Sequence, residues 1–105
     1  MTDRLILGDF SNMKLFDLHF HMDWISWQDS YIELVAEAPG RRRHLKFSSP
    51  RNLCIEQGFN GNLSGMAIMD ISDRQWDSTN LEVINFEQDA GITFLAESME
   101  IIGDT

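Results

Sequence analysis

The amino-acid sequence predicts an all-β fold, a mostly antiparallel β-sandwich or small β-barrel of about seven to nine short strands. Apolar and polar residues alternate strictly from Phe16 to Trp24, which is the two-residue period of a strand with one buried face. Turn-forming residues recur at intervals typical of short strands joined by hairpins. No segment has the sustained 3.6-residue apolar period of a helix. The 105 residues fit a single globular domain, 1–105.

Turn signals divide the first half of the chain into four predicted strands, at residues 4–7, 14–25, 28–36 and 43–48. Gly8-Asp9 closes the first strand. Pro39-Gly40 predicts a turn before the fourth, because proline presets φ and glycine permits positive φ. In the second strand we expect five apolar side chains to face the core: Phe16, Leu18, Phe20, Met22 and Trp24. Their polar neighbours are expected to face water.

The second half of the chain adds further predicted strands, at residues 52–57, 63–72, 81–86, 92–96 and 98–102, the last as an extension or a short edge. Ser49-Pro50 separates the first of them from the preceding strand. Asn60-Gly61 predicts a two-residue hairpin turn, because type I′ turns need positive φ at both positions. Gln88–Gly91 predicts a second hairpin. The polar segment 73–80 is expected to be a loop or one short helical turn.

The composition predicts a protein that folds without disulfide or metal support. Apolar residues make up 43% of the chain, including seven Phe and three Trp, which is enough for a core at this length. Cys54 is the only cysteine, and its apolar neighbours predict a buried, unreactive thiol in a reducing compartment. The chain shows no leader peptide and no long apolar run, so we expect a cytoplasmic protein.

Acidic residues are concentrated in the last third of the chain. The net charge is −9, and residues 70–105 hold nine acids against one base, Arg74. Such a field repels phosphate groups, so we expect no binding to nucleic acid or to an anionic membrane. The same field attracts a basic protein and speeds its encounter. The alternative is that the excess acid only keeps the chain in solution.

One cluster has the residue types of a metal site. Four polar residues alternate along the predicted 14–25 strand and share its outer face: Asp17, His19, His21 and Asp23. Two imidazoles at this spacing can bind one zinc ion, with a carboxylate as ligand or as hydrogen-bond partner of a ligand. A third ligand has to come from another segment, and three residues have suitable chemistry: His44, Glu33 and Glu56. The alternative is a solvated outer face without a metal.

Two further groups are candidate partner-binding residues. The run Arg41-Arg42-Arg43 follows a turn and has the donors to hold a phosphate, a carboxylate, or the acidic half of the same chain or of a second copy. The acidic group consists of Asp73, Trp76, Asp77 and Glu82. Trp76 stands in a polar segment, where a tryptophan either closes one end of a core or anchors an interface. The same two alternatives apply to Trp24 and Trp27 at the end of the predicted 14–25 strand.

The sequence has no nucleophile elbow, phosphate loop or dinucleotide fingerprint. We therefore predict a non-enzymatic interaction module that binds a basic protein through the surface of residues 70–105. In size and charge alone, without any shared motif, the chain is similar to small acidic immunity proteins, which neutralise a toxic or basic partner. Two alternatives stay open. One is a metal-binding protein or metal-dependent enzyme that uses His19 and His21, and the other is a homo-oligomer held by an edge strand and the arginine run.

Overall fold

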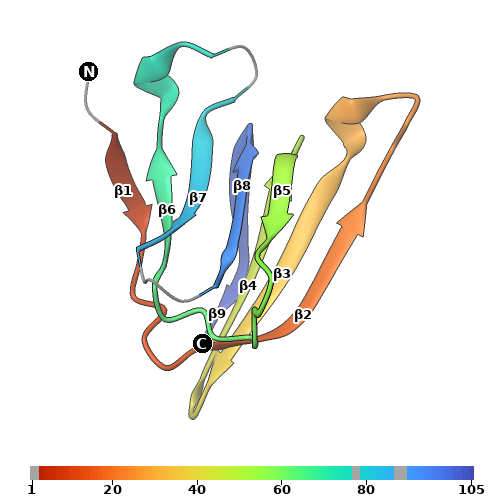
Figure 1. Cartoon of the computed structure of the whole chain (residues 1–105). Coiled ribbons are helices and arrows are strands. Elements are labelled where there is room, and N and C mark those ends of the chain that lie inside the picture. Colours follow the sequence, from red (N-terminus) through yellow and green to blue (C-terminus); the bar gives the residue numbers. More distant parts are fainter. Residues whose placement is uncertain (1–2, 77–78, 87–89) are drawn as a thin grey trace.

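The fold of the chain is all-β, as the sequence predicts (Figure 1). The computed structural model describes residues 3–76, 79–86 and 90–105. This part of the chain forms nine strands and two single 3₁₀ turns: β1 (Arg4–Leu7), β2 (Lys14–His21), η1 (Trp27–Asp29), β3 (Tyr31–Ala38), β4 (Arg41–Ser48), β5 (Arg51–Ile55), β6 (Met66–Asp70), η2 (Ser72–Arg74), β7 (Leu81–Asn85), β8 (Ile92–Ala96) and β9 (Ser98–Asp104). The described residues include no helix that is long and apolar enough to cross a membrane.

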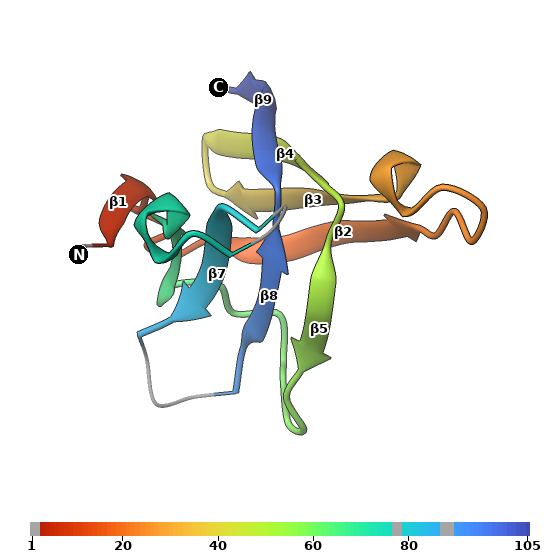
Figure 2. The ribbon, with the colours of Figure 1, turned by 90° about the horizontal axis from the view of Figure 1, so that it is seen from above.

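The strands form two separate antiparallel sheets, so the fold is a sandwich rather than a closed barrel. One sheet has the order β1-β6-β7-β8-β5 and the other the order β2-β3-β4-β9. Figure 1 shows the two sheets face to face, and Figure 2 shows them from above. Strands β7 and β8 pair as the sequence predicts, although Gln88 and Asp89 of the predicted turn lie outside the described residues. The first strand β1, the edge strand β5 and the last strand β9 instead pair with strands distant in the sequence.

The hydrophobic core lies between the two sheets. Alternate side chains of the strands point inward, and the rings of Phe47 on β4 and Phe94 on β8 meet edge to face with centroids 4.9 Å apart. Both rings are buried. Loop residues Phe10, Met13 and Leu63 close the core at the end where β2 begins. The packing of these side chains therefore joins the face of one sheet to the face of the other.

Strand β2 is shorter than predicted. It ends at His21, because Asp23 accepts hydrogen bonds from the following backbone and turns the chain away from the sheet. Met22 and Trp24 are therefore exposed, and the prediction that they face the core is wrong. The turn η1 then takes the place of the first residues of the predicted 28–36 strand.

Phe16 is also exposed, which corrects the predicted apolar face at the start of β2. Leu15 and Asp17 pair with successive residues of β3, so Phe16 is the extra residue of a β-bulge. Beyond the bulge the alternation holds, and Leu18 and Phe20 pack against the core as predicted. A bulge changes the register by one residue, which the alternation of residue types alone does not reveal.

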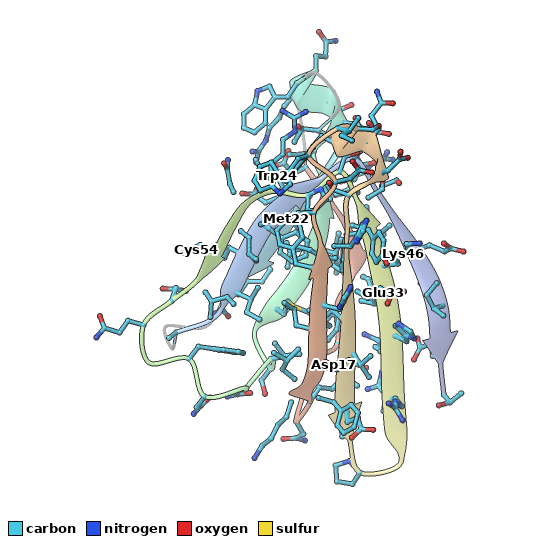
Figure 3. All side chains as sticks on the ribbon, turned by 90° about the vertical axis from the view of Figure 1, so that its right-hand side faces the viewer. Asp17, Met22, Trp24, Glu33, Lys46 and Cys54 are labelled. Carbon is cyan, nitrogen blue, oxygen red and sulfur yellow. The ribbon has the colours of Figure 1, made fainter. Side chains whose placement is uncertain are left out.

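Two local predictions for the segment after β4 are wrong. Asn60-Gly61 does not join two paired strands, because β5 pairs with β8 whereas β6 pairs with β1 and β7. Of these two residues only Gly61 has a positive φ, of 94°. Cys54 is exposed rather than buried, because it lies on β5 opposite Thr93 and faces away from the core (Figure 3).

Candidate functional site

A tight turn follows β2 and is fixed by side-chain hydrogen bonds. The Asp23 carboxylate accepts hydrogen bonds from the N–H groups of Ile25, at 3.0 Å, and of Ser26, at 2.9 Å. The hydroxyl oxygen of Ser30 accepts a hydrogen bond from the Asp23 N–H at 2.8 Å. The N–H groups of Ser26 and Ile25 also hold the pKa of the Asp23 carboxyl below its usual range. The turn is therefore ordered by its own contacts.

This turn presents apolar side chains to solvent. Ile25 is 100% exposed and Trp24 is 80% exposed, and Met22 beside them is exposed as well. The ring of Trp27 packs against the ring of Trp24, with centroids 5.9 Å apart. The Trp27 indole N–H donates to the carbonyl oxygen of Pro50 at 3.0 Å. Figure 3 shows Met22 and Trp24 at one end of the sandwich. Apolar side chains are more stable when removed from water, and these side chains are not. The turn is therefore a candidate contact surface.

A second loop carries Trp76, which is 48% exposed. The Arg74 guanidinium lies over the Trp76 ring, 5.1 Å from its centroid. Arg74 also pairs with Asp3 and, at 3.4 Å, with Glu82. The hydrogen bonds to Asp3 raise the pKa of Arg74 above its usual value. Trp76 is thus held at the surface by an arginine that acidic residues fix in place.

The two loops lie at the same end of the sandwich. Strands β2 and β6 both run toward this end, and Figure 1 shows the coils of η1 and η2 at the top of the molecule, η2 on the left above β6 and η1 on the right above β2 and β3. A hollow of about 480 Å³ is lined by Trp27, Arg51 and Asn52. A second hollow, of about 260 Å³, is lined by Asn52 and Trp76 together with residues of β7 and β8. Asn52 lines both hollows and so lies between the hollow beside Trp27 and the hollow beside Trp76. We call the surface of residues 22–30, 51–52 and 71–76 the tryptophan-bearing end.

The tryptophan-bearing end and its rim are acidic. The described loop residues and strand termini at this end include six carboxylates against three arginines: Asp3, Asp23, Asp29, Asp70, Asp73 and Glu97 against Arg4, Arg51 and Arg74. The Ser72 hydroxyl and N–H lower the pKa of the Asp70 carboxyl, so this group stays charged to lower pH than a free aspartate. The end therefore combines exposed aromatic side chains with a net negative charge.

The structure places three of the four predicted residues of the acidic group at or beside the tryptophan-bearing end. Asp73 and Trp76 lie on the η2 loop, and Glu82 joins them through its ion pair with Arg74. Asp77 lies outside the described residues. The sequence does not single out Ile25, and it places Trp24 on the core-facing side of the predicted 14–25 strand, with an interface anchor as the alternative. Aspartate favours turns because its carboxylate can bond the backbone two residues on, as Asp23 does with the N–H of Ile25, so Asp23 is a residue type compatible with an end of β2 at this point.

The arginine run lies at the opposite end of the sandwich, on the β3–β4 turn (Figure 1). Arg41 pairs with Asp9 at 3.3 Å, and Arg42 pairs with Glu37 at 3.4 Å. Arg43 is buried and pairs with the Asp104 carboxylate at 3.3 Å, which is the one ion pair between the run and residues 70–105 among the described residues. These three side chains are held separately and do not form one anion-binding cluster with each other.

Most of the metal candidates share the outer face of the four-stranded sheet, where Figure 3 labels Asp17 and Glu33. His19 lies opposite Glu33 in the register, and Nε2 of His44 is 3.9 Å from Oε1 of Glu33. His21 stacks on Tyr31 instead, with ring centroids 5.0 Å apart. No group of three or more His, Cys, Asp or Glu side chains among the described residues is arranged to hold a metal ion.

The two remaining metal candidates are engaged elsewhere. The Asp23 carboxylate binds backbone N–H groups of its own turn. Oε1 of Glu56 accepts a hydrogen bond from the N–H of Gly91 at 3.0 Å, beside the other sheet. The structure therefore brings no third ligand to His19 and His21 from these positions.

Comparisons of the chain with protein-family models, with curated proteins and with solved structures find no match. The function of the chain therefore has to be inferred from its own residues. The tryptophan-bearing end is the surface on which exposed apolar side chains, fixed geometry and charge coincide.

Proposed function

We propose that the chain is a non-enzymatic interaction module that binds a basic protein through its tryptophan-bearing end. The observation that carries this proposal is the exposure of Trp24 and Ile25 on an ordered turn. Asp23 makes three hydrogen bonds that hold this turn: its carboxylate accepts two of them and its N–H donates the third. Burying a large apolar side chain contributes about 1.5–3 kcal/mol. Neither side chain makes that contribution within the chain alone, so it is available to a partner.

The geometry of the turn favours binding. Association normally costs free energy to order flexible side chains and loops, by about 0.5–1.5 kcal/mol for each immobilised side chain. Here Asp23 and Ser30 already fix the backbone, and Trp27 already contacts the Trp24 ring. Tryptophan, methionine and arginine are also the residue types enriched in protein interfaces, and tryptophan is the commonest kind of anchor. We infer that Trp24 is the main anchor and that Trp76 is a second one.

The charge of this end supports a basic partner. Carboxylates outnumber arginines on it, and the whole chain carries a net charge of −9. Complementary charge at the rim mainly raises the rate of encounter and excludes partners of like charge, while the buried aromatic residues supply most of the affinity. Binding should therefore weaken as salt is added but should not vanish.

Selection from a random peptide library against the immobilised chain tests this function. A parallel selection uses the double variant Trp24→Ala/Ile25→Ala. The matched control is Phe86→Ala, because Phe86 is also an exposed aromatic residue, at 70%, but lies beyond β7 at the opposite end. We expect peptides that combine Arg or Lys with apolar residues, and at least about tenfold weaker binding to the double variant.

The control variant should bind the same peptides as the wild-type chain. Enrichment of acidic peptides, or failure to enrich any peptide that depends on Trp24 and Ile25, would contradict the proposed function. Equal loss of binding in Phe86→Ala would place the contact away from the tryptophan-bearing end.

A further inference from the structure

A polar hollow lies at the end of the sandwich opposite the tryptophan-bearing end. It has a volume of about 450 Å³, within the range of about 300–1,000 Å³ typical of small-molecule sites. It is lined by Asn12, Met13, Lys14, Asn60, Asn62 and Ser64. None of these residues carries a carboxylate, although the chain has 17 acidic residues.

The walls of this hollow are held together by backbone hydrogen bonds. The N–H of Leu15 donates to the carbonyl oxygen of Gly61 at 2.7 Å. The N–H of Leu63 donates to the carbonyl oxygen of Met13 at 3.0 Å. These bonds join the segment that leads into β2 to the loop between β5 and β6. The side chains on the two segments are therefore fixed relative to each other.

The asparagine side chains present donors to the hollow. Oδ1 of Asn60 accepts a hydrogen bond from the N–H of Asn62 at 3.0 Å. Oδ1 of Asn62 accepts from the Ser64 N–H at 3.0 Å and from the Ser64 hydroxyl at 2.7 Å. Because a backbone N–H can only donate, the amide oxygens must be the bonded atoms. The amino groups of both asparagines are left without a partner among the described residues.

Lys14 adds a positive charge that no acid in the described part of the chain neutralises. Among the described residues it takes part in no ion pair. Glu37 lies across from Lys14 in the β2–β3 register, but the Glu37 carboxylate is held by Nε of Arg42 at 3.4 Å. The hollow is thus lined by an ammonium group and by amide donors, and the amide oxygens of Asn60 and Asn62 each already accept a hydrogen bond.

We propose that this hollow binds the phosphate or sulfate group of a small molecule. A set of donors with one unpaired cation recognises an oxyanion, because hydrogen bonds between charged groups are about twice as strong as neutral ones. A cation would be repelled by Lys14. Donors that come from two separate segments suit a tetrahedral group better than a planar carboxylate. The hollow has room for the rest of the molecule, since one water occupies only about 30 Å³.

Nuclear magnetic resonance of the side-chain amide groups tests the proposal with inorganic phosphate as the probe. Phosphate is expected to shift the amide signals of Asn60 and Asn62 and to saturate. Sulfate should give the same pattern, and acetate should bind about tenfold more weakly. Lys14→Gln is expected to weaken phosphate binding by about tenfold or more, which corresponds to one charge-assisted hydrogen bond.

Two control variants make the result decisive. Lys46→Gln removes a lysine that lies over Tyr31 on the outer face of the four-stranded sheet, and it should leave phosphate binding unchanged. Asn12→Gly removes an amide but keeps the backbone conformation, because Asn12 has a φ of 61° that glycine adopts freely. It should weaken binding as Lys14→Gln does. Shifts that do not saturate, that spread over all basic residues, or that persist in Lys14→Gln would overturn the proposal. Equal affinity for acetate would overturn the assignment to a tetrahedral oxyanion.

Discussion

The substitution Phe94→Ala is predicted to remove a large part of the stability of the fold. Phe94 is buried on β8, and its ring meets that of Phe47 from the other sheet. Replacing a buried phenylalanine by alanine costs about 3–5 kcal/mol, because apolar contacts are lost and a cavity remains. The aromatic pair adds about 0.5–1.5 kcal/mol beyond burial, so we expect a loss in the upper part of that range, about 4.5 kcal/mol. Domains of this size are stable by only about 5–15 kcal/mol.

Urea unfolding followed by tryptophan fluorescence measures the loss. With a urea dependence of about 2 kcal/mol per molar, the midpoint should fall by about 2 M. The control Phe86→Ala removes an exposed ring and should change the free energy of unfolding by less than about 0.5 kcal/mol. Similar effects of the two substitutions would refute the placement of the core between the sheets.

Three further predictions concern a buried arginine, the Asp23 carboxylate and the two histidines of β2. Arg43→Met is expected to lower the free energy of unfolding, measured in urea, by about 2–3 kcal/mol. The buried guanidinium donates hydrogen bonds to the backbone carbonyl oxygens of Gly8 and Asp9, and the substitution leaves both oxygens without this donor. Arg42→Met, at an exposed ion pair, should cost less than about 1 kcal/mol, and equal costs would contradict the difference in burial. Backbone hydrogen bonds lower the pKa of Asp23 in the folded state. Its carboxylate therefore stabilises the fold fully above the usual Asp pKa of 3.8. This stabilisation is lost as the pH falls through the lower pKa of the folded state. Melting curves should therefore show Asp23→Ala to be less stable than the wild type at neutral pH, with a difference that shrinks in strong acid; a pH-independent difference would argue against this origin. The untagged chain should carry no stoichiometric zinc in native mass spectrometry, whereas one zinc per chain that is lost in both His19→Ala and His21→Ala would establish the metal site.

The class of the fold follows from local patterns, but the partners of the strands do not. Alternation identifies the outer face of β2, where Asp17, His19 and His21 are exposed as predicted. It fails at Phe16, because one extra residue in a strand reverses every inward and outward assignment before it. The signal at Asn60-Gly61 is local too. It fails because β5 finds its partner in β8, which comes almost forty residues later in the chain.

The tryptophan-bearing end could be predicted only in part. Trp76 is recognisable because it stands in a polar, acidic segment. Trp24 is harder to recognise, because it continues the alternation of β2 and so fits a core position as well. Ile25 follows Trp24 directly and breaks the alternation, and nothing in the sequence marks it as a contact residue. Only the hydrogen bonds of Asp23 show that the strand ends before them. That Asn52 links Trp27 to Trp76 depends on the order of the strands, which alternation and turn signals leave open.

Mapping the contact of a selected basic peptide tests the proposed binding site most directly. The isotope-labelled chain is titrated with the peptide while backbone amide shifts are recorded. The shifts are predicted to concentrate in residues 22–30, 51–52 and 71–76, and to disappear in Trp24→Ala. Shifts centred on His19 and Glu33, on the outer face of the four-stranded sheet, that persist in Trp24→Ala would contradict binding through the tryptophan-bearing end.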